Sequence, residues 1–376
     1  MKINLTQNKN FKLFKIISKV AQENNQTVYI VGGYVRDLLM QRKAPTDIDF
    51  VTEQSGIELA KAVGKELGDL KVSVFKTYGT AMIKYQDLDL EFVGARKESY
   101  SEDSRKPAVE TGTLEDDQKR RDFTVNALAI SLNAENFGEL IDPFNGREDM
   151  QNKILRTPLE PAQTYSDDPL RMMRAIRFAS VLHFEIEKNS LEAIKQEAER
   201  IKIVSMERIM VEFNKIMLSE KPSVGLKLME ETTLLEKIIP ELTALRGIEE
   251  VEGQTHKDNF WHTLEVVDNI SKNTDNLWLR WAALLHDIGK APTKKFVEKI
   301  GWTFHGHEFL GSKMVKNLFT RLKLPLGTDM KYVQKMVKLS SRPIALIDDG
   351  TSDSALRRLL FDAGEDLEDL FTLCKA

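Results

Sequence analysis

The sequence has one cysteine, Cys374, in 376 residues. This count excludes an internal disulfide framework and a cysteine-based zinc ribbon, and it is typical of proteins from a reducing compartment. No run of about 18 apolar residues occurs, and the lysine-rich N-terminus lacks the apolar core of a signal peptide. We therefore expect a cytoplasmic protein that does not cross a membrane.

The chain also lacks an excess of positive charge, since its formal net charge is -4. A polyanionic partner would have to be held by local basic patches. Residues 313–342 hold eight Lys or Arg and one acid, whereas residues 345–370 hold eight acids and two arginines. This polarity is consistent with a nucleic-acid-binding face, but a merely solvated charged face is the commoner explanation.

The apolar pattern changes along the chain. Residues 8–23 have the spacing of an amphipathic helix, and short strands and helices follow, among them "AMIKY" and "LDLEFV" as a hairpin. From Asp168 onward the helical period dominates, and the region after Gly247 holds all four tryptophans and five of the six histidines. The predicted segments are an N-terminal helix (1–26), an α/β head (27–150), a helical neck and body (151–245), a histidine-bearing helical domain (246–347) and a helical tail (348–376).

Two aspartates, Asp47 and Asp49, alternate with apolar residues in "TDIDFV". On a strand they point to the same side, where two carboxylates repel each other unless a hard cation such as Mg²⁺ lies between them. Two such ions would activate an attacking hydroxyl and neutralise a leaving pyrophosphate. Glu91 in "LDLEFV" offers a third carboxylate. The alternative is a surface strand whose aspartates form caps or ion pairs.

Residues suited to phosphate binding surround this pair in the sequence. A glycine pair upstream lets the backbone approach a phosphate, and an arginine follows one helical turn later. "RRDFTVNALAI" places two arginines, whose forked donors suit a triphosphate or a ribose, next to an apolar element. A surface ion pair is the plainer explanation of that second motif. The candidates are Gly32, Gly33, Arg36, Arg120, Arg121 and Asp122.

The stretch "SDDPLRMMRAIRFAS" predicts a helix that starts with Asp168 as N-cap and Pro169 as its first residue. Arg171, Arg174 and Arg177 follow at intervals of three, and capping does not explain such a row. A rigid Asp–Arg pair can accept a hydrogen bond from an exocyclic amine and donate one to the neighbouring ring nitrogen. Cytosine and adenine present that edge, whereas uracil and guanine would leave groups unpaired.

In this order, the motifs GG-x₂-RD, D-x-D, RRD-x₃-NA, DD-x₂-R and "MERIMVEFNKIM" resemble those of the class II tRNA nucleotidyltransferase / poly(A) polymerase family. The resemblance covers residues 27 to about 245, and the histidine-bearing region extends it to about residue 347. It implies an α+β protein with a polymerase-β-like nucleotidyltransferase head followed by all-α neck, body and HD domains. It also implies that the tail helps to hold tRNA.

Carried over residue by residue, the resemblance implies that Asp47 and Asp49 bind Mg²⁺. Gly33 and Arg36 would contact the nucleotide, and Arg121 would help with the triphosphate. The RRD-x₃-NA motif adds Asn126 to the nucleotide-binding set. The nucleotide-selecting motif of the family matches Asp168, Arg171, Arg174 and Arg177. Its usual first residue is Glu, whereas this chain has Asp167, a change that leaves the base-pairing residues intact.

The histidine region contains "FWHTLEVV", "LLHDIGK" and "FHGHEFLG". An adjacent His-Asp pair joined by distant histidines resembles the HD phosphohydrolase superfamily, whose site activates water for phosphoester hydrolysis. The implied ligands of a divalent transition metal or Mg²⁺ are His262, His286, Asp287 and His307, with His305 as a neighbour. A further histidine is expected near Ser340 and is missing, so an active site and a purely structural domain are both left open.

The resemblance predicts addition of CCA to tRNA 3′ ends from CTP and ATP. The open alternatives within the family add CC only, A only or poly(A), and residues within 96–117 are where a specificity loop is expected. From other classes, the chain could be an HD-type phosphohydrolase whose head only binds RNA, or a non-catalytic RNA-binding protein. The last helix ends without a cap, which indicates a shortened chain or a reduced tail. The sequence does not give the oligomeric state.

Overall fold

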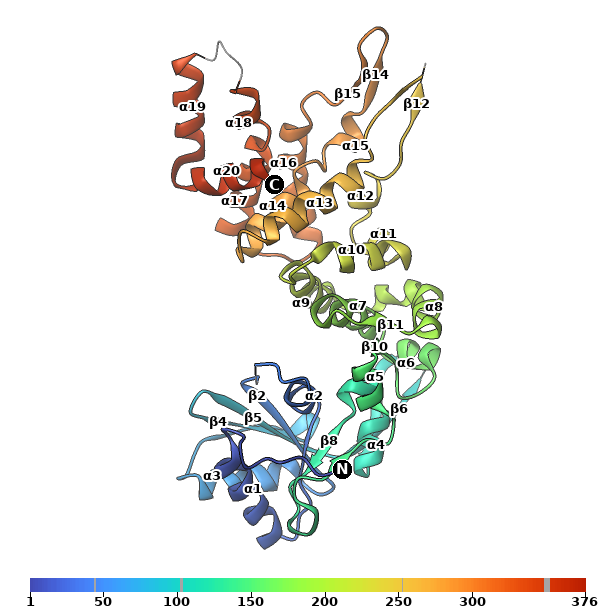
Figure 1. Ribbon diagram of the computed structural model, residues 1–376, viewed down its shortest axis with the longest axis vertical. Helices are drawn as coiled ribbons and strands as arrows, with labels where there is room; N and C mark the ends of the chain where they lie inside the picture. Colours follow the sequence, from blue (N-terminus) through green and yellow to red (C-terminus); the bar gives the residue numbers. More distant parts are fainter. Residues whose placement is uncertain (44, 102–103, 252, 348–351) are drawn as a thin grey trace. The chain divides into compact units, whose positions relative to one another are not determined.

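A computed structural model of the protein describes residues 1–43, 45–101, 104–251, 253–347 and 352–376. It divides into two compact units (Figure 1), Met1–Asp168 with Glu185–Ser190, and Pro169–Phe184 with Leu191–Ala376. One unit contains a large sheet and the other is mainly helical, which confirms the α+β class. The finer division into five segments stays a prediction. No helix in the described ranges is long and apolar enough to cross a membrane.

A seven-stranded sheet forms the head, with the strand order β3-β4-β5-β2-β1-β8-β9. Within it β2 and β5 run parallel and the other neighbours run antiparallel. The predicted hairpin is confirmed, because β4 and β5 pair antiparallel. The strands are β1 (Tyr29–Val31), β2 (Asp47–Thr52), β3 (Val72–Phe75), β4 (Thr80–Tyr85), β5 (Leu88–Gly94), β8 (Ala129–Ser131) and β9 (Leu140–Ile141).

The core of the head lies on one face of this sheet. Phe50 of β2 and Phe92 of β5 are fully buried and stack with their ring centroids 5.0 Å apart. The helices α1 (Phe11–Glu23) and α3 (Gly56–Glu66) pack together beside the sheet (Figure 1), and Phe14 brings its ring to 6.4 Å from that of Phe50. Because side chains alternate along a strand, burial of the even-numbered residues turns the carboxylates of β2 and β5 to the opposite face.

Short elements connect this sheet to the motifs. α2 (Gly33–Leu39) follows β1, and α4 (Leu114–Lys119) ends just before the arginine pair. β6 (Arg96–Ser101) and β7 (Ser104–Thr111) form a hairpin within the segment expected to carry the specificity loop. Residues 102 and 103 of that segment lie outside the described residues.

The segment after residue 150 is mainly helical, as expected, with one short parallel strand pair between β10 (Ile154–Leu155) and β11 (Glu185–Ile186). The expected helix start is wrong, because α7 (Leu170–Leu182) has Pro169 as its N-cap residue and Asp168 stands one position before the cap. Pro169 has φ -61° and ψ -17°, which suits the helix, whereas Asp168 is extended and ends α6 (Pro161–Asp167).

The helical unit is organised around large buried side chains. Trp281 is fully buried and brings its ring to 5.2 Å from Phe213 and 5.9 Å from Phe319. Beside it, the buried Arg280 donates to the carbonyl oxygens at the end of α9. The helices are α8 (Lys188–Glu197), α9 (Met206–Met217), α10 (Pro222–Glu231), α11 (Leu234–Ile238), α12 (Pro240–Thr243), α13 (Asn259–Ser271), α14 (Leu277–Leu285), α15 (Lys290–Thr293), α16 (His307–Arg321), α17 (Thr328–Leu339), α18 (Arg342–Ala345), α19 (Asp353–Ala363) and α20 (Leu367–Lys375).

The histidine-bearing region is mainly helical, as expected, but it also contains strands. Two short hairpins interrupt it and project from one side of the unit, away from α18–α20 (Figure 1). They pair β12 (Glu250–Val251) with β13 (Gln254–Thr255), and β14 (Lys295–Val297) with β15 (Gly301–Thr303). Positive φ at Lys299 and Gly301 gives the tight turn that joins the second pair.

The acidic tail pairs with the basic segment before it. Lys335 forms an ion pair with Asp366, and Arg342 forms one with Asp362. Part of the charge polarity seen in the sequence is therefore neutralised within the helical unit. A nucleic-acid-binding role for the remaining basic side chains of 313–342 stays a prediction.

Candidate functional site

Carboxylates gather on the open face of the head sheet. In the parallel register of β2 and β5, Asp49 lies opposite Glu91, and Asp47 lies opposite Asp89. All four alternate with buried apolar residues, so they share one face. The sequence analysis missed Asp89, although the alternation of "LDLEFV" marks it as clearly as it marks Glu91.

The electrostatics of this face favour a bound cation. Burial raises the pKa of Asp49 above its usual value, Arg121 opposes the shift, and the neighbouring charge of Asp47 adds to it. Partial burial and the charge of Asp49 likewise raise the pKa of Glu91. Carboxylates that resist ionisation together are relieved by a hard cation with oxygen ligands, so this donor set fits Mg²⁺.

Gly32 allows the arginine motif to lie close to the carboxylates of β2 and β5. Its φ of 73° and ψ of -139° are accessible to glycine and strained for other residues. A Cβ atom at this position would lie 2.9 Å from Nη1 of Arg121 and 3.5 Å from Oδ2 of Asp49. The absence of a side chain at Gly32 therefore leaves room for the Arg121 guanidinium beside Asp49.

A residue that sequence reasoning missed holds both arginines. Asp117 is fully buried on α4 and accepts hydrogen bonds from Nε of Arg120 at 3.0 Å and from Nε of Arg121 at 3.0 Å. Burial by itself would raise the pKa of Asp117, but the two guanidinium groups outweigh it and the pKa is lowered. Its position three and four residues before the arginines on a helix is the signal that could have found it.

The other motif residues of the head form one buried network. Nη1 of Arg36 donates to Oδ1 of Asn126 at 2.7 Å, and Nε of Arg36 donates to Asp37 at 2.8 Å. Nδ2 of Asn126 in turn donates to Asp122 at 3.0 Å. Two motifs some 90 residues apart thus meet here, and their predicted roles in nucleotide binding stay predictions.

The motif expected to select the base continues onto α7. Arg171, Arg174 and Arg177 lie half-buried along this helix at intervals of three. Arg177 forms an ion pair with the buried Glu212 of α9, with Nε 2.5 Å from Oε2, and its guanidinium lies 3.7 Å from the ring centroid of Phe178. Glu212, which belongs to "MERIMVEFNKIM", thus fixes the end of the arginine row, a role that sequence reasoning missed.

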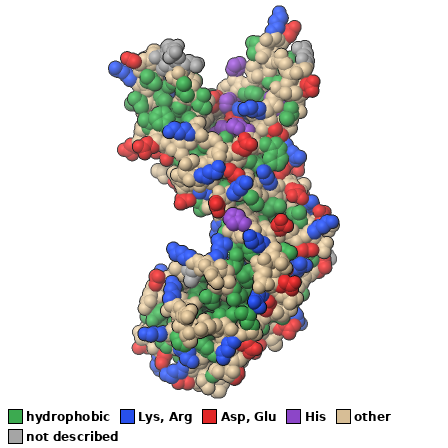
Figure 2. All heavy atoms as spheres, in the orientation of Figure 1, with side chains coloured by type: hydrophobic (Ala, Val, Ile, Leu, Met, Phe, Trp, Pro, Cys, Tyr) green, Lys and Arg blue, Asp and Glu red, His purple; other side chains and the backbone are tan. Residues whose placement is uncertain are grey.

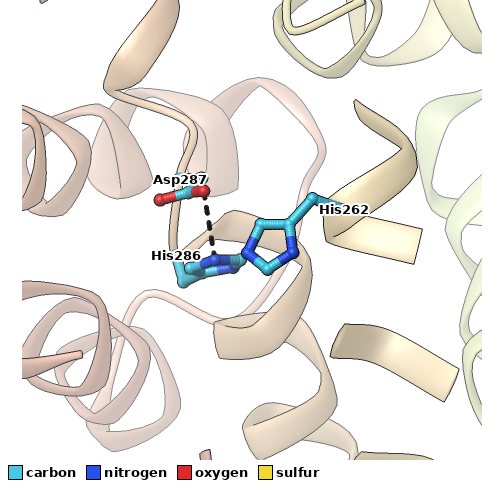
Figure 3. Close-up of side chains that lie close together, drawn as sticks. All are labelled: His262, His286 and Asp287. Atoms are coloured by element: carbon cyan, nitrogen blue, oxygen red, sulfur yellow. Dashed lines mark ion pairs between the residues drawn. The ribbon is translucent and has the colours of Figure 1, made fainter. Parts of the chain in front are cut away.

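A second candidate site lies in the helical unit. His262 comes from α13, His286 ends α14, and Asp287 follows it (Figure 3). Among the described residues, these three are the one set of at least three His, Cys, Asp or Glu whose ligand atoms lie within 4.8 Å of one another. Histidines also line a hollow in the surface of this unit (Figure 2).

Hydrogen bonds orient the imidazole of His286 and that of His307, which lies outside this set but beside Asp287. Nδ1 of His286 lies 2.8 Å from the carbonyl oxygen of Ala283, and Nδ1 of His307 lies 2.9 Å from that of Phe304. Their Nε2 atoms lie 3.2 Å and 3.4 Å from the carboxylate of Asp287. A donor set of two imidazole nitrogens and a carboxylate, with the His286 ring held by a backbone carbonyl, fits a divalent metal ion.

The carboxylate of Asp287 also forms an ion pair with a lysine. Nζ of Lys290 lies 2.6 Å from Oδ2 of Asp287. Burial would raise the pKa of Asp287, but hydrogen bonds from His286 and His307 and the charge of Lys290 hold it far below the usual range. Burial and the adjacent His286 lower the pKa of His262, which favours the neutral imidazole that binds metals.

Ser340 stands where a further histidine was expected. Its side chain is buried and donates to the carbonyl oxygen of Val337 at 3.0 Å. Its own carbonyl accepts a contact from Sγ of Cys374 at 2.9 Å. This position is therefore part of the packing between α17 and α20.

Three known families match successive parts of the chain. Residues 28–156 match the poly A polymerase head domain, and residues 183–245 match the probable RNA and SrmB-binding site of polymerase A. Residues 259–363 match the HD domain. The chain is 31% identical to a multifunctional CCA protein of Pseudomonas syringae, over 79% of this chain and 71% of that protein.

The chain belongs to the tRNA nucleotidyltransferase / poly(A) polymerase family.

Other members of the family are similar over most of this chain. An A-adding tRNA nucleotidyltransferase of Aquifex aeolicus is 34% identical over 76% of the chain, and a CCA-adding enzyme of Bacillus velezensis is 35% identical over 75%. This nucleotidyltransferase-family chain covers 34% and 65% of the length of those relatives. Thus the curated proteins it matches are longer than the region they share with it.

Solved structures of tRNA-processing proteins are similar in fold to this chain. A tRNA nucleotidyltransferase complexed with a primer tRNA and an incoming ATP analog has a TM-score of 0.65 and 27% identity, and covers 95% of this chain and 94% of that one. A tRNA-processing enzyme has a TM-score of 0.72 and 25% identity, and covers 100% and 90%. The expected family and head fold are therefore confirmed for this nucleotidyltransferase-family chain.

Proposed function

We propose that the chain transfers CMP and AMP from CTP and ATP to the 3′ end of tRNA and releases pyrophosphate. The observation that carries this proposal is the face formed by Asp47, Asp49 and Glu91, with the Arg121 guanidinium beside it. The names of the relatives, which include A-adding and CCA-adding enzymes, support the same reaction. A cytoplasmic location goes with it as part of the proposal.

In this mechanism Asp47 and Asp49 would hold Mg²⁺, which supplies positive charge to the reacting phosphate and the leaving pyrophosphate. Arg121 binds the triphosphate from its place beside Asp49, and Arg120, which shares the partner Asp117 with it, assists. Such placement holds the α-phosphate where the tRNA 3′-hydroxyl can attack it in line, and positioning of this kind supplies much of the rate of a bimolecular reaction.

Base selection falls to Asp168 and Arg171. The carboxylate of Asp168 accepts from the exocyclic amine of cytosine or adenine, and Arg171 donates to the adjacent ring nitrogen. The position of Arg171 in the first turn of α7, three residues after Asp168, supports this division of roles. The ion pair of Arg177 with Glu212 anchors the same helix on α9.

The product is proposed to be the full CCA end, with CC, A or poly(A) addition as the alternatives. The test offers tRNA ending before CCA, after C and after CC, with CTP, ATP or both, and sizes the products. Addition of two C residues and then one A supports the proposal, whereas a single A on the CC-ended substrate alone would assign the chain to the A-adding group.

The same assay tests the site. Asp47→Ala combined with Asp49→Ala should abolish incorporation, while Asp87→Ala, an exposed acid between β4 and β5, should leave it unchanged. Incorporation that survives the double substitution rules out the carboxylate face as the catalytic centre.

A second candidate function is phosphoester hydrolysis at the HD site. The observation that favours it is the compact set of His262, His286 and Asp287. Release of phosphate from 2′,3′-cyclic or 2′-phosphorylated nucleotides with Ni²⁺, Mn²⁺ or Mg²⁺ should disappear in His286→Ala. His305→Ala, which removes an exposed histidine near the same site, is the matched control. If the wild type releases no phosphate with any of the three ions, the HD domain is structural.

A further inference from the structure

We infer that Asp117 is a positioning residue for the nucleotide: it fixes the guanidinium of Arg121 beside Asp49 and acts on nucleotide binding through that arginine. This inference rests on the proposed nucleotidyl transfer and adds to it, because Asp117 lies outside the motifs that carry the family resemblance. Of the three acids in "LEDD", Asp117 is the one that stands three and four residues before the two arginines.

The contacts of Asp117 single it out. A capping box formed by Thr113 and Asp116 starts α4 and fixes the orientation of its first turn. Asp117 lies in that turn and accepts hydrogen bonds from Nε of Arg120 and from Nε of Arg121. Nη2 of Arg121 lies 2.9 Å from Oδ2 of Asp117. One fully buried carboxylate thereby holds two arginines that keep part of their side chains at the surface.

The far side of Arg121 reaches the catalytic face. Its Nη1 lies in the space beside Gly32, next to Oδ2 of Asp49, and 3.4 Å from the carbonyl oxygen of Asn126. Arg121 is thus held from behind by Asp117 and lies beside Asp49 in front. A guanidinium restrained on one edge loses less conformational freedom when its other donors meet a phosphate.

A purely stabilising role for this buried charge group is the weaker explanation. Buried ion pairs contribute little net stability relative to apolar side chains of similar volume, since their desolvation offsets their attraction. The two arginines are, in addition, those at which the family motif places nucleotide binding. The ion pairs of Asp117 contribute little to stability and hold Arg121 beside the carboxylate face, so positioning of the arginine explains them better than stabilisation of the fold.

Asp117→Asn separates positioning from simple charge. Asparagine can accept from one arginine through its single carbonyl oxygen, so at least one of the guanidinium groups loses its partner. The substitution also removes a negative charge near the bound triphosphate, which by Coulomb attraction alone would strengthen binding. Positioning predicts the opposite sign, namely about tenfold weaker binding, the size expected when a charge-assisted hydrogen bond is lost.

The experiment measures CTP and ATP dissociation constants by equilibrium dialysis, and KM and kcat with tRNA lacking CCA, for the full chain. Glu115→Gln is the matched control, because it removes an acid of the same helix whose carboxylate pairs with Lys119. Asp117→Asn should raise both the dissociation constant and KM about tenfold, while Glu115→Gln leaves them unchanged. Unchanged or tighter binding in Asp117→Asn overturns the inference.

A double-mutant cycle tests whether Asp117 acts through Arg121. In an Arg121→Ala background, Asp117→Asn should change nucleotide binding less than about twofold, because the group that it positions is gone. A full tenfold effect there would mean that Asp117 acts by another route. If circular dichroism shows that Asp117→Asn is unfolded, Arg121→Lys replaces it: the charge remains but the fork held by Asp117 is lost, and wild-type binding would then contradict positioning.

Failure of the proposed reaction is recognised separately. A wild-type chain that binds CTP or ATP but incorporates no nucleotide refutes nucleotidyl transfer, while the dialysis of the variants still decides the role of Asp117. A wild-type chain that binds neither nucleotide refutes both.

Discussion

The head and the histidine region each place a carboxylate where a metal ion would bind, but they prepare it in opposite ways. In the head, burial and neighbouring carboxylates raise the pKa of Asp49 and Glu91, with Arg121 as a partial counter-charge. In the histidine region, donors from His286, His307 and Lys290 lower the pKa of Asp287 despite its burial. Negative charge is in excess at the first site and is already compensated at the second.

The two sites would therefore respond differently to a divalent cation. At the head, a divalent ion relieves repulsion that the fold has built in, so binding and charge neutralisation act together. At Asp287, the ion has to compete with an ammonium group that lies 2.6 Å from the carboxylate. The same residue type, aspartate, is therefore poised for metal in one place and held by the protein's own cations in the other.

The largest effect on activity is expected from a substitution that fills the space beside Gly32. Gly32→Ala should lower kcat/KM for nucleotide incorporation about 100-fold, because a Cβ atom 2.9 Å from Nη1 of Arg121 displaces a positioned donor. Steady-state incorporation assays measure it. Gly364→Ala is the matched control, since Gly364 has a similar backbone, φ 57° and ψ -132°, with no atom within 4 Å of the added Cβ. An equal loss in both would attribute the effect to backbone strain.

Asp287→Asn should lower the free energy of unfolding by about 3 kcal/mol in EDTA, because it leaves the buried donors around it without their charged partner. The folded pKa of Asp287 lies below its usual value of 3.8, so this stabilisation is present above that pH and is lost as the pH falls through the lowered pKa. Urea unfolding at neutral pH gives the value. Glu298→Gln, an exposed acid of the β14–β15 hairpin, should change it little.

Lys290→Gln should increase the affinity of the HD site for Mn²⁺ about tenfold, because it removes the ammonium group that competes for Asp287. Isothermal titration calorimetry of the metal-free chain measures this without relying on activity. Lys294→Gln serves as control, since the amine of Lys294 pairs with Glu249 instead. Weaker Mn²⁺ binding in Lys290→Gln would show that the lysine supports the metal site.

The smallest effect is a change in the free energy of unfolding on substitution of Asp49, with a sign opposite to that expected for Asp287→Asn. Asp49→Asn should raise the free energy of unfolding by about 1 kcal/mol in EDTA, even though it damages the reaction. The folded pKa of Asp49 is raised above 3.8, so its ionised form costs stability at neutral pH, and the cost disappears as the pH falls through the raised pKa. Thermal unfolding at pH 7 checks it, with Asp87→Asn as control. A loss of stability would mean that the attraction between Asp49 and Arg121 outweighs the cost of burying the Asp49 carboxylate.

Much of the head could be predicted because its signals are local. The alternation in "TDIDFV" and "LDLEFV" indicated two strands with their carboxylates on one face, and the structure pairs Asp49 with Glu91 directly. The hairpin of β4 and β5 followed from the same pattern. Period-two alternation predicts which face a side chain takes, since it depends only on the strand and on the burial of the other face.

Other features escaped because they depend on competition between local signals or on distant contacts. The Asp-Pro pair looked like a helix start at Asp168, but Pro169 took the cap position itself. The two hairpins near the histidines are too short for their periodicity to stand out from the helices around them. The role of Glu212 depends on the packing of α7 against α9, which no spacing within either helix reveals.

By itself, the sequence determined the family, the sheet-plus-helix architecture and the residue types at both sites, because these follow from short motifs and from the period of apolar residues. Only the tertiary structure decided how each charge is balanced. Folding places the Arg121 guanidinium within hydrogen-bonding distance of the buried Asp117, and the Lys290 ammonium within that distance of the buried Asp287. The roles of Asp117 and Lys290 follow from these contacts. Electrostatic energy depends on distance and burial, and neither can be read along a chain before it folds.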